Sequence, residues 1–225
     1  MRRGLLLIAG LALLGCTAAR PARDPLTADE HNDLGVAYFQ RGETRRAVGE
    51  FERAVALRPT WARALVNLGD ARLALGEVPA AIDAYQRAAT LAPDDPAVAN
   101  NLAWALLQDP ARWPEAEAII DHALAQNPEP RGYYLDTLGE LRLRKGDNQG
   151  ALDAFQSALA DQALERGTTR ALVLDHAAEA HARLGDEAAA TRCRSLAEIE
   201  RGFQDRPRAP AGGDGTAVGG PGSVC

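Results

Sequence analysis

Small and apolar residues recur along the chain at a spacing of 34 positions. Within each unit the apolar positions lie three or four residues apart, which predicts amphipathic helices. Glycines and prolines at fixed places in the unit are expected to end the helices, glycine in a left-handed cap after the first helix and proline after the second. Each unit is therefore predicted to form a helical hairpin. The matched residues are Leu34 and Leu68, Gly35 and Gly69, Gly42 and Gly76, Ala47 and Ala81, Phe51 and Tyr85, Ala54 and Ala88, and Pro59 and Pro93.

Glycine inside a helix costs about 1 kcal/mol relative to alanine, so Gly35 and Gly69 need a structural reason. We expect each of them to lie where two helices cross too closely for a Cβ atom. The alanines of the second helices permit the same close approach, and Phe51 and Tyr85 are expected to fill the space between repeats. The recurring residues therefore predict a stack of closely packed hairpins.

Three further units follow with more variation. The third, residues 96–131, has Ala103 in place of the glycine and a turn that is one residue longer, QDPARWP. The fourth, residues 132–165, restores Leu138-Gly139 but lacks the closing proline. The fifth, residues 171–204, matches less well and has an unusually polar second helix. Because the last unit of such an array needs a polar outer face, we expect the fifth unit to cap the stack.

The period of 34 residues, with Leu-Gly, then Ala-x3-Phe or Tyr, and then Pro, resembles the tetratricopeptide repeat (TPR). The resemblance implies an all-α fold, a right-handed α-solenoid of about five TPR-like helical hairpins whose first helices line a concave groove. It also implies that a protein or peptide partner binds in this groove. The resemblance covers residues 28–204 in five units: 28–61, 62–95, 96–131, 132–165 and 171–204.

The resemblance also implies which side chains line the groove, because fixed positions of the first helix face it in TPR proteins. The resulting surface is polar and acidic, with two aromatic residues. Asparagine amides can hydrogen-bond an extended peptide, and the aromatic rings can anchor an apolar side chain. The side chains expected there are Asn32, Asp33, Arg63, Asn67, Asp70, Asn100, Asn101, Trp104, Tyr133, Asp136 and Glu140.

Two alternatives stand beside this groove assignment. Trp104 is equally suited to packing with Trp113 against the irregular third turn, and Asn67 and Asn101 also fit a plain solvated helix face. The groove lacks the basic carboxylate clamp of chaperone-binding TPR domains, because Val36 and Ala97 occupy two of its places. A chaperone C-terminus is therefore not the expected partner.

The start of the chain carries a different signal. Arg2 and Arg3 precede an uncharged apolar stretch, residues 4–15, which is shorter than the roughly 20 residues of a membrane-spanning helix and typical of a signal peptide. The end of the stretch, Leu-Leu-Gly-Cys, resembles the lipobox of bacterial lipoproteins. This resemblance implies cleavage after Gly15 and lipid attached to Cys16. An uncleaved anchor, or an ordinary signal that happens to contain cysteine, is the alternative.

From this signal we expect residues 1–15 to be a lipoprotein signal peptide and residues 16–27 a lipidated N-terminus and linker. Thr17, rather than aspartate, follows the cysteine. By the enterobacterial sorting rule, this residue implies an anchor in the outer membrane, facing the periplasm. The predicted location is therefore the cell envelope.

Composition and motifs exclude several function classes. The net charge of −6 and the lack of a basic patch argue against a nucleic-acid partner. His176 and His181 are five residues apart, roughly 500° around a helix, so they do not share a face as a zinc-binding pair would. No phosphate-binding loop and no G-x-S-x-G nucleophile motif is present in the sequence. We therefore expect no metal, no cofactor and no catalysis.

The other two cysteines lie near the end of the sequence. Cys193 is expected to pack in the last helix, and Cys225 follows a stretch rich in glycine and proline. Residues 205–225 have too few apolar side chains to offset the entropy of ordering, so we expect a disordered tail. In an oxidising periplasm the two cysteines could pair with each other, or Cys225 could pair with another chain.

Two functions from different classes fit these features. The first is a membrane-anchored scaffold that binds partner proteins and assists the assembly or stability of a cell-envelope complex. In architecture it resembles the pilotin-like lipoproteins of type IV pilus secretins and the adaptor lipoproteins of cell-wall hydrolases. The second is a tethered chaperone or carrier for exported polypeptides or polysaccharide-synthesis components. The groove residues do not select between them, and fold does not fix function.

Overall fold

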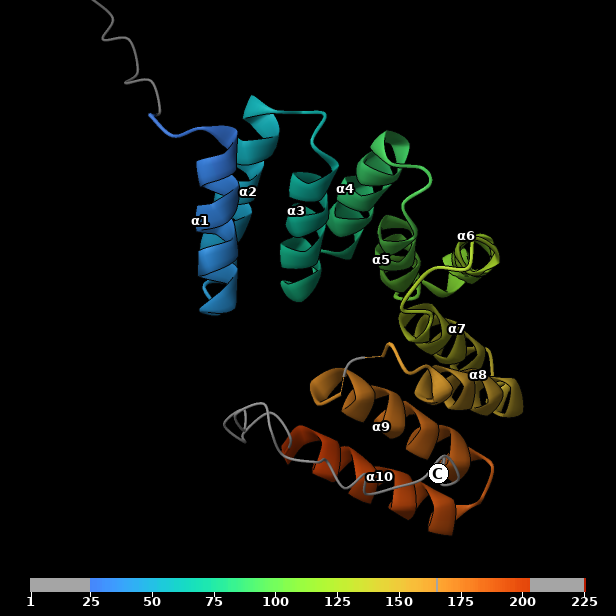
Figure 1. The fold of residues 1–225 in the computed structure, drawn as a ribbon. Helices are drawn as coiled ribbons and strands as arrows, with labels where there is room; N and C mark the ends of the chain where they lie inside the picture. Colours follow the sequence, from blue (N-terminus) through green and yellow to red (C-terminus); the bar gives the residue numbers. More distant parts are fainter. Residues whose placement is uncertain (1–24, 165, 203–224) are drawn as a thin grey trace, which may run out of the picture.

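The structure is a computed structural model that describes residues 25–164, 166–202 and 225. Within these residues it contains ten α-helices, one short 3₁₀ helix and no strand, which confirms the predicted all-α solenoid (Figure 1). None of the helices in this part of the chain is long and apolar enough to span a lipid bilayer. The elements are α1 (Ala28–Gln40), α2 (Thr44–Leu57), α3 (Ala62–Ala74), α4 (Val78–Leu91), α5 (Pro96–Leu106), η1 (Pro110–Arg112), α6 (Trp113–Ala125), α7 (Gly132–Arg144), α8 (Asn148–Ala160), α9 (Thr168–Arg183) and α10 (Glu187–Gly202).

The ten helices form five hairpins that stack in chain order. The first helix of each hairpin contacts the second helix of its own hairpin and the first helix of the next. Consecutive second helices make no contacts of comparable extent. The first helices therefore form the inner side of a curved stack, and the second helices form its outer side. Figure 1 shows that α1, α3 and α5 stand side by side, whereas α7 and α9 lie at a steep angle to them, so the stack bends between α5 and α7.

The glycines inside the first helices are explained by aromatic rings of the second helices. A Cβ atom on Gly35 would lie 2.6 Å from the ring of Phe51, and one on Gly69 would lie 2.6 Å from the ring of Tyr85. Phe155 presses on Gly139 in the same way. The rings also join the cores that connect adjacent hairpins. We expected these glycines where two helices cross closely. The structure shows that the atoms that leave no room for a Cβ belong to an aromatic ring of the same hairpin.

The turns follow the expected chemistry. Gly42 has a φ of +75° and Gly76 a φ of +76°, so both helices end in the predicted left-handed cap. The longer third turn contains η1, and its indole is hydrogen-bonded: Trp113 Nε1 donates to the carbonyl oxygen of Leu107 at 3.1 Å. This turn precedes the bend of the stack between α5 and α7.

The fifth hairpin has the polar outer face that the sequence predicts. On α8, Leu152, Phe155 and Leu159 are buried in the core that connects the fourth and fifth hairpins. The residues at the same places on α10 are exposed and polar, as a terminal hairpin requires. They are Thr191, Arg194 and Glu198. The hairpin begins earlier than predicted, because α9 starts at Thr168 rather than at residue 171.

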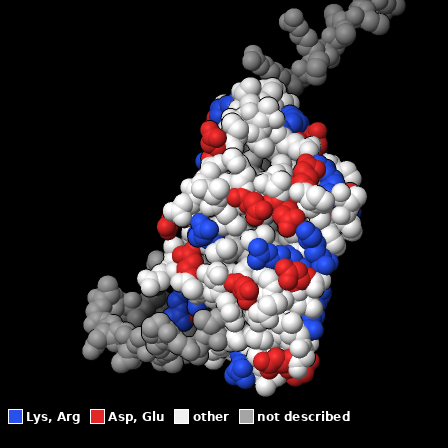
Figure 2. Space-filling view, turned by 90° about the vertical axis from the view of Figure 1, so that its right-hand side faces the viewer, with Lys and Arg blue, Asp and Glu red and all other residues white. Residues whose placement is uncertain are grey.

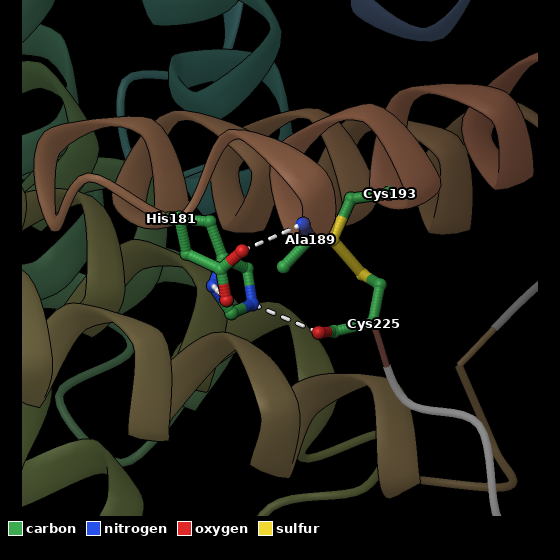
Figure 3. Close-up of a disulfide and its surroundings, with 5 residues drawn as sticks. His181, Ala189, Cys193 and Cys225 are labelled. Carbon is green, nitrogen blue, oxygen red and sulfur yellow. Dashed lines mark hydrogen bonds and ion pairs between the residues drawn. A yellow bond between two sulfur atoms is a disulfide. The ribbon is translucent and has the colours of Figure 1, made fainter.

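Cys193 and Cys225 form a disulfide within the chain (Figure 3). Cys193 is fully buried on α10, and Cys225 packs against the core of the last two hairpins. The carbonyl oxygen of Cys225 also lies 2.8 Å from His181 Nε2 (Figure 3). Of the two pairings left open by the sequence, the structure has the intrachain one. The tail predicted to be disordered lies outside the described residues except for Cys225, which the disulfide attaches to α10. The signal peptide and Cys16 also lie outside them.

Candidate partner-binding groove

Two positions of every first helix recur on the inner side of the solenoid. They are the third and the second residue before the small residue at the centre of the helix, and we call them the minus-three and minus-two positions. The minus-three residues of the first four hairpins are Asn32, Val66, Asn100 and Asp136, and the minus-two residues of the last four are Asn67, Asn101, Thr137 and His176. The minus-three residue of one hairpin contacts the minus-two residue of the next at the first and the last junction.

Hydrogen bonds close the first and the last of these junctions. Asn67 on α3 donates from Nδ2 to Oδ1 of Asn32 on α1, at 2.7 Å. At the other end of the stack, His176 Nδ1 on α9 lies 2.8 Å from Asp136 Oδ1 on α7. Asn32 is buried, with 1% of its surface exposed. These side chains therefore join neighbouring hairpins, each through one of its polar atoms.

The two middle junctions lack this bond. Val66 has no polar atom to offer Asn101, which makes no side-chain hydrogen bond with any described residue. At the α5–α7 junction, Thr137 Oγ1 donates to the carbonyl oxygen of Tyr133 in its own helix, at 3.2 Å. Asn100 Oδ1 is buried and has no hydrogen-bond partner among the described residues. The helix α5 therefore carries two adjacent amides that the fold does not use.

The Asp136–His176 pair sets the protonation of the imidazole. Burial disfavours the charged ring, but the hydrogen bond and negative charge of Asp136, helped by Glu140 and Asp175, outweigh it and raise the pKa of His176 above its ordinary value. The carboxylate thus favours the protonated form of the His176 ring. Sequence reasoning considered His176 only as a metal ligand and missed this role.

Asp70 is held from behind by its own hairpin. The hydroxyl of Tyr85 donates to Asp70 Oδ1 at 2.6 Å. Burial raises the pKa of the Asp70 carboxyl, although this hydrogen bond opposes the shift. Burial and the nearby carboxylate also raise the pKa of the Tyr85 hydroxyl. Asp70 thus serves partly to fix the ring that presses on Gly69.

Two arginines on the inner side were not predicted from the sequence. Arg144 Nε donates to Glu140 at 2.8 Å, and its Nη1 donates to the carbonyl oxygen of Leu107 in the preceding hairpin at 3.0 Å. Arg183 repeats the arrangement one hairpin later, with Glu179 and the carbonyl oxygen of Leu143. The recurrence of Glu-x3-Arg in α7 and α9 is the sequence signal that could have identified these bridges. Glu140 is therefore neutralised by its neighbour.

The remaining predicted groove residues differ in exposure. Arg63 is exposed, and Trp104 and Tyr133 are half-buried. Trp104, Tyr133 and Trp113 pack against the same core cluster. Trp104 therefore packs against the core together with Trp113, as one of the two alternatives predicted, and still keeps accessible surface. Five of the predicted residues each have one polar atom hydrogen-bonded within the fold: Asn32, Asn67, Asp70, Asp136 and Glu140. The other four, Asn100, Asn101, Trp104 and Tyr133, lie on α5 and α7. Partner binding by any of them stays a prediction.

The outer side of the molecule has no region of one sign of charge in the view of Figure 2. This view shows the side at the right of Figure 1, where α6 and α8 lie, and basic residues there are interspersed with acidic ones. Within the described residues, no group of three or more His, Cys, Asp and Glu side chains is arranged to hold a metal ion. His176 and His181 have separate neighbours, Asp136 and Cys225.

These observations define an α-solenoid of helical hairpins whose first helices form the inner side. Family models of the tetratricopeptide repeat match residues 32–96 and residues 73–138. Residues 32–138 therefore match the tetratricopeptide repeat that the sequence predicted. Among curated proteins, none matches the chain in sequence.

Several solved structures have the same fold. PilF of Pseudomonas aeruginosa is 22% identical with a TM-score of 0.63, over 77% of this chain and 76% of that one. PilW, described as a widely conserved type IV pilus biogenesis factor, is 20% identical with a TM-score of 0.67, over 76% of this chain and 78% of that one. A chain of the APC/C hetero-tetramer Cut9–Hcn1 is 22% identical with a TM-score of 0.69, over 79% of this chain but 34% of that one. This chain therefore spans about a third of that relative. At these identities the likeness concerns the fold alone.

Proposed function

We propose that the protein is a membrane-anchored scaffold whose inner groove binds a segment of a partner protein and so assists the assembly or stability of a cell-envelope complex. The observation that carries the proposal is the composition of the surface in the middle of the groove. There, two half-buried aromatic residues, Trp104 and Tyr133, lie on the same side as two amides that the fold leaves unused. Aromatic surface together with unused hydrogen-bonding groups is the usual composition of a protein-binding patch.

The anchoring part of the proposal rests on the sequence. The lipobox-like segment supports lipid on Cys16 and an outer-membrane location facing the periplasm. The likeness to PilF and PilW supports an envelope role, since PilW is described as a pilus biogenesis factor. We propose no catalytic role, no cofactor, no metal and no nucleic-acid partner.

A tethered chaperone or carrier for exported polypeptides is the alternative function. A scaffold binds one folded partner in fixed proportion, whereas a chaperone binds many unfolded clients. Glu140 and Glu179 are paired with Arg144 and Arg183, which leaves less acidic surface in the groove to attract charged clients.

Site-specific photocrosslinking in the native envelope tests the proposal. A photoreactive phenylalanine analogue replaces Tyr133 in one protein and Asp83, which is exposed on α4, in the matched control. The proposal expects one predominant crosslinked partner from position 133 and none of that species from position 83. Equal crosslinking from both positions would contradict a groove site. A broad set of products that grows when unfolded exported proteins accumulate would favour the chaperone.

A further inference from the structure

We infer that one edge of the first two hairpins rests on the surface of the lipid bilayer, with Leu57 and Leu91 in the headgroup region. This edge comprises residues 25–30, 57–63 and 91–95, and we call it the anchor edge. The inference rests on the proposed function, because it requires the lipid on Cys16. It goes beyond an anchor, since it specifies which side of the solenoid faces the membrane.

The first argument is a pair of exposed leucines at the same place in consecutive hairpins. Leu57 ends α2 and Leu91 ends α4, each three residues after a fully buried alanine, Ala54 or Ala88. The two leucines are 56% and 41% exposed. Six large apolar side chains are exposed in the described part of the chain, and only these two share a repeat position. Apolar surface that gathers at one edge indicates a contact with another apolar surface.

The second argument is a comparison along the stack. The residues at the same place in the third, fourth and fifth hairpins are polar, namely Gln126, Asp161 and Glu200. Figure 1 shows that the start of α1 and the loops α2–α3 and α4–α5 lie at one end of the stack, at the top of the view. The loops after α6 and α8 lie lower, toward and beyond the bend. Leucine therefore occupies this place only in the two hairpins that share an edge with the start of α1.

The third argument is the position of the anchor edge next to the proposed lipid. Thr27 is the N-cap of α1 and follows Cys16 by 11 residues, a length of chain that spans at most about 40 Å. Asp29, in the first turn of α1, is paired with Arg58 in the α2–α3 loop. The connection to Cys16 therefore ends at the anchor edge itself. Tethering gives this edge a high effective concentration at the bilayer, so a weak apolar contact is enough to orient the solenoid.

The chemistry of the anchor edge suits a zwitterionic lipid surface. Trp61 is half-buried against the core of the first hairpins, and the Arg58 guanidinium lies over its ring, 4.4 Å from the centroid. Tryptophan is favoured at membrane–water interfaces, and arginine can lie there with its charged end in water. The charged residues of the edge are two basic and four acidic: Arg58, Arg63, Asp29, Glu30, Asp94 and Asp95. Because the acidic residues outnumber the basic ones, we expect no attraction to anionic lipids.

This orientation also determines how the groove lies relative to the membrane. The helices α1, α3 and α5 stand side by side and begin at the anchor edge (Figure 1). They would therefore project from the bilayer, and the groove that they line would open along the membrane surface. The last two hairpins, beyond the bend, would extend away from the lipid.

Quenching of tryptophan fluorescence tests the docking with the full, lipidated chain. The protein is reconstituted in phosphatidylcholine vesicles, with and without bromine on the acyl chains close to the headgroup. We expect bromine to quench part of the emission, and Trp61→Phe to lose that part. The quenching should also be lost in Leu57→Gln/Leu91→Gln, which copies the residue of the third hairpin, and kept in the matched control Leu172→Gln, an exposed leucine on α9.

Three results would contradict the docking. They are no quenching in the unaltered protein, equal quenching in all four proteins, and quenching that requires added phosphatidylglycerol. Leu57→Gln/Leu91→Gln should leave the thermal midpoint unchanged, because both side chains are exposed. A lowered midpoint with quenching lost would show that the two leucines serve the fold and would also overturn the inference.

Photocrosslinking in the native envelope identifies what covers the anchor edge. A photoreactive phenylalanine analogue replaces Leu57 in one protein and Leu172 in the control. We expect adducts with the mass of a phospholipid at position 57 and none at position 172. A protein crosslinked at position 57 in place of lipid would overturn the inference, because the edge would then be a protein interface.

The combined results separate this inference from the proposed function. If position 133 crosslinks one predominant partner but the bilayer does not quench Trp61, the scaffold stands and the docking fails. If phospholipid crosslinks at position 57 but position 133 yields no predominant partner, the docking stands and the groove fails. If the purified protein carries no lipid on Cys16, the anchoring part of the proposed function fails and the docking fails with it.

Discussion

Asn67 donates a hydrogen bond of 2.7 Å to Asn32, and this bond joins α3 to α1 on the inner side of the solenoid. Asn32 is almost completely buried, so replacing it with valine would leave the Asn67 amide without its partner. We expect Asn32→Val to lower the free energy of unfolding by about 1–2 kcal/mol. Urea denaturation measures the change, with Asp33→Ala as an exposed control on the same helix. An unchanged stability would mean that the bond contributes nothing.

The contact between the Tyr85 ring and Gly69 leads us to expect that one added methyl group on α3 destabilises the fold. Gly69→Ala places a Cβ atom 2.6 Å from a ring that is 1% exposed and hydrogen-bonded to Asp70, so the ring must move. We expect a loss of about 1–3 kcal/mol of stability.

Gly49 provides the matched control for this substitution. It lies inside α2, and a Cβ atom there would meet nothing within 4 Å. Gly49→Ala should raise stability by about 0.4–1 kcal/mol, because alanine has less freedom to lose on folding. Calorimetric midpoints that shift in the same direction for both variants would refute the packing argument.

The Asp136–His176 pair predicts a dependence of stability on pH. The pKa of His176 is raised in the folded protein above its ordinary 6.5, so the folded state binds the proton more tightly than the unfolded chain. The contribution of the pair is therefore complete below about pH 6.5 and is lost as the pH rises through the folded pKa. Urea unfolding of the unaltered protein and of His176→Asn should differ more at about pH 5.5 than at about pH 8.5. A constant difference would show that His176 does not titrate with folding.

The Cys193–Cys225 disulfide predicts a local effect of reduction. Its cysteines are 32 residues apart, a loop length for which a disulfide typically adds about 2–4 kcal/mol of stability. Cys225→Ser, or a phosphine reductant, should increase hydrogen exchange in α9 and α10 and leave α1 and α2 unchanged. Equal exchange with and without reductant would mean that the last hairpin is stable without the bond.

The proposed lipid on Cys16 leads to a prediction about the location of the protein. Cys16→Ser should abolish incorporation of labelled palmitate and move the protein out of the membrane fraction, because a single acyl chain already contributes about 0.8 kcal/mol for each buried CH₂ group. Circular dichroism should remain helical, since the solenoid begins after residue 27. Membrane retention of an unlabelled variant would point instead to an uncleaved apolar anchor.

The sequence predicted the hairpins because their causes are local and periodic. The spacing of apolar residues places Gly35 and Phe51 on the packing faces of their helices. A left-handed cap favours glycine, which is the residue at position 42. The use of the groove residues was less predictable. Periodicity places Asn67 and Asn100 on the same inner side, but it does not say that one finds a partner across the junction and the other does not. That difference depends on the residue of the neighbouring hairpin and on its rotamer, neither of which is periodic.

The disulfide also determines what happens when the chain is cut between its two cysteines. Residues 193–225 form a covalent ring in which Cys193 belongs to the core of the last hairpins. Proteolysis at one bond of residues 203–224 would add one water to the molecular mass and release no fragment. The two pieces would separate only after reduction. A reducing gel would therefore show two fragments for the cut protein, whereas a non-reducing gel would show one covalent molecule for both the cut and the intact protein. The stretch can thus be cut once without being lost from the solenoid.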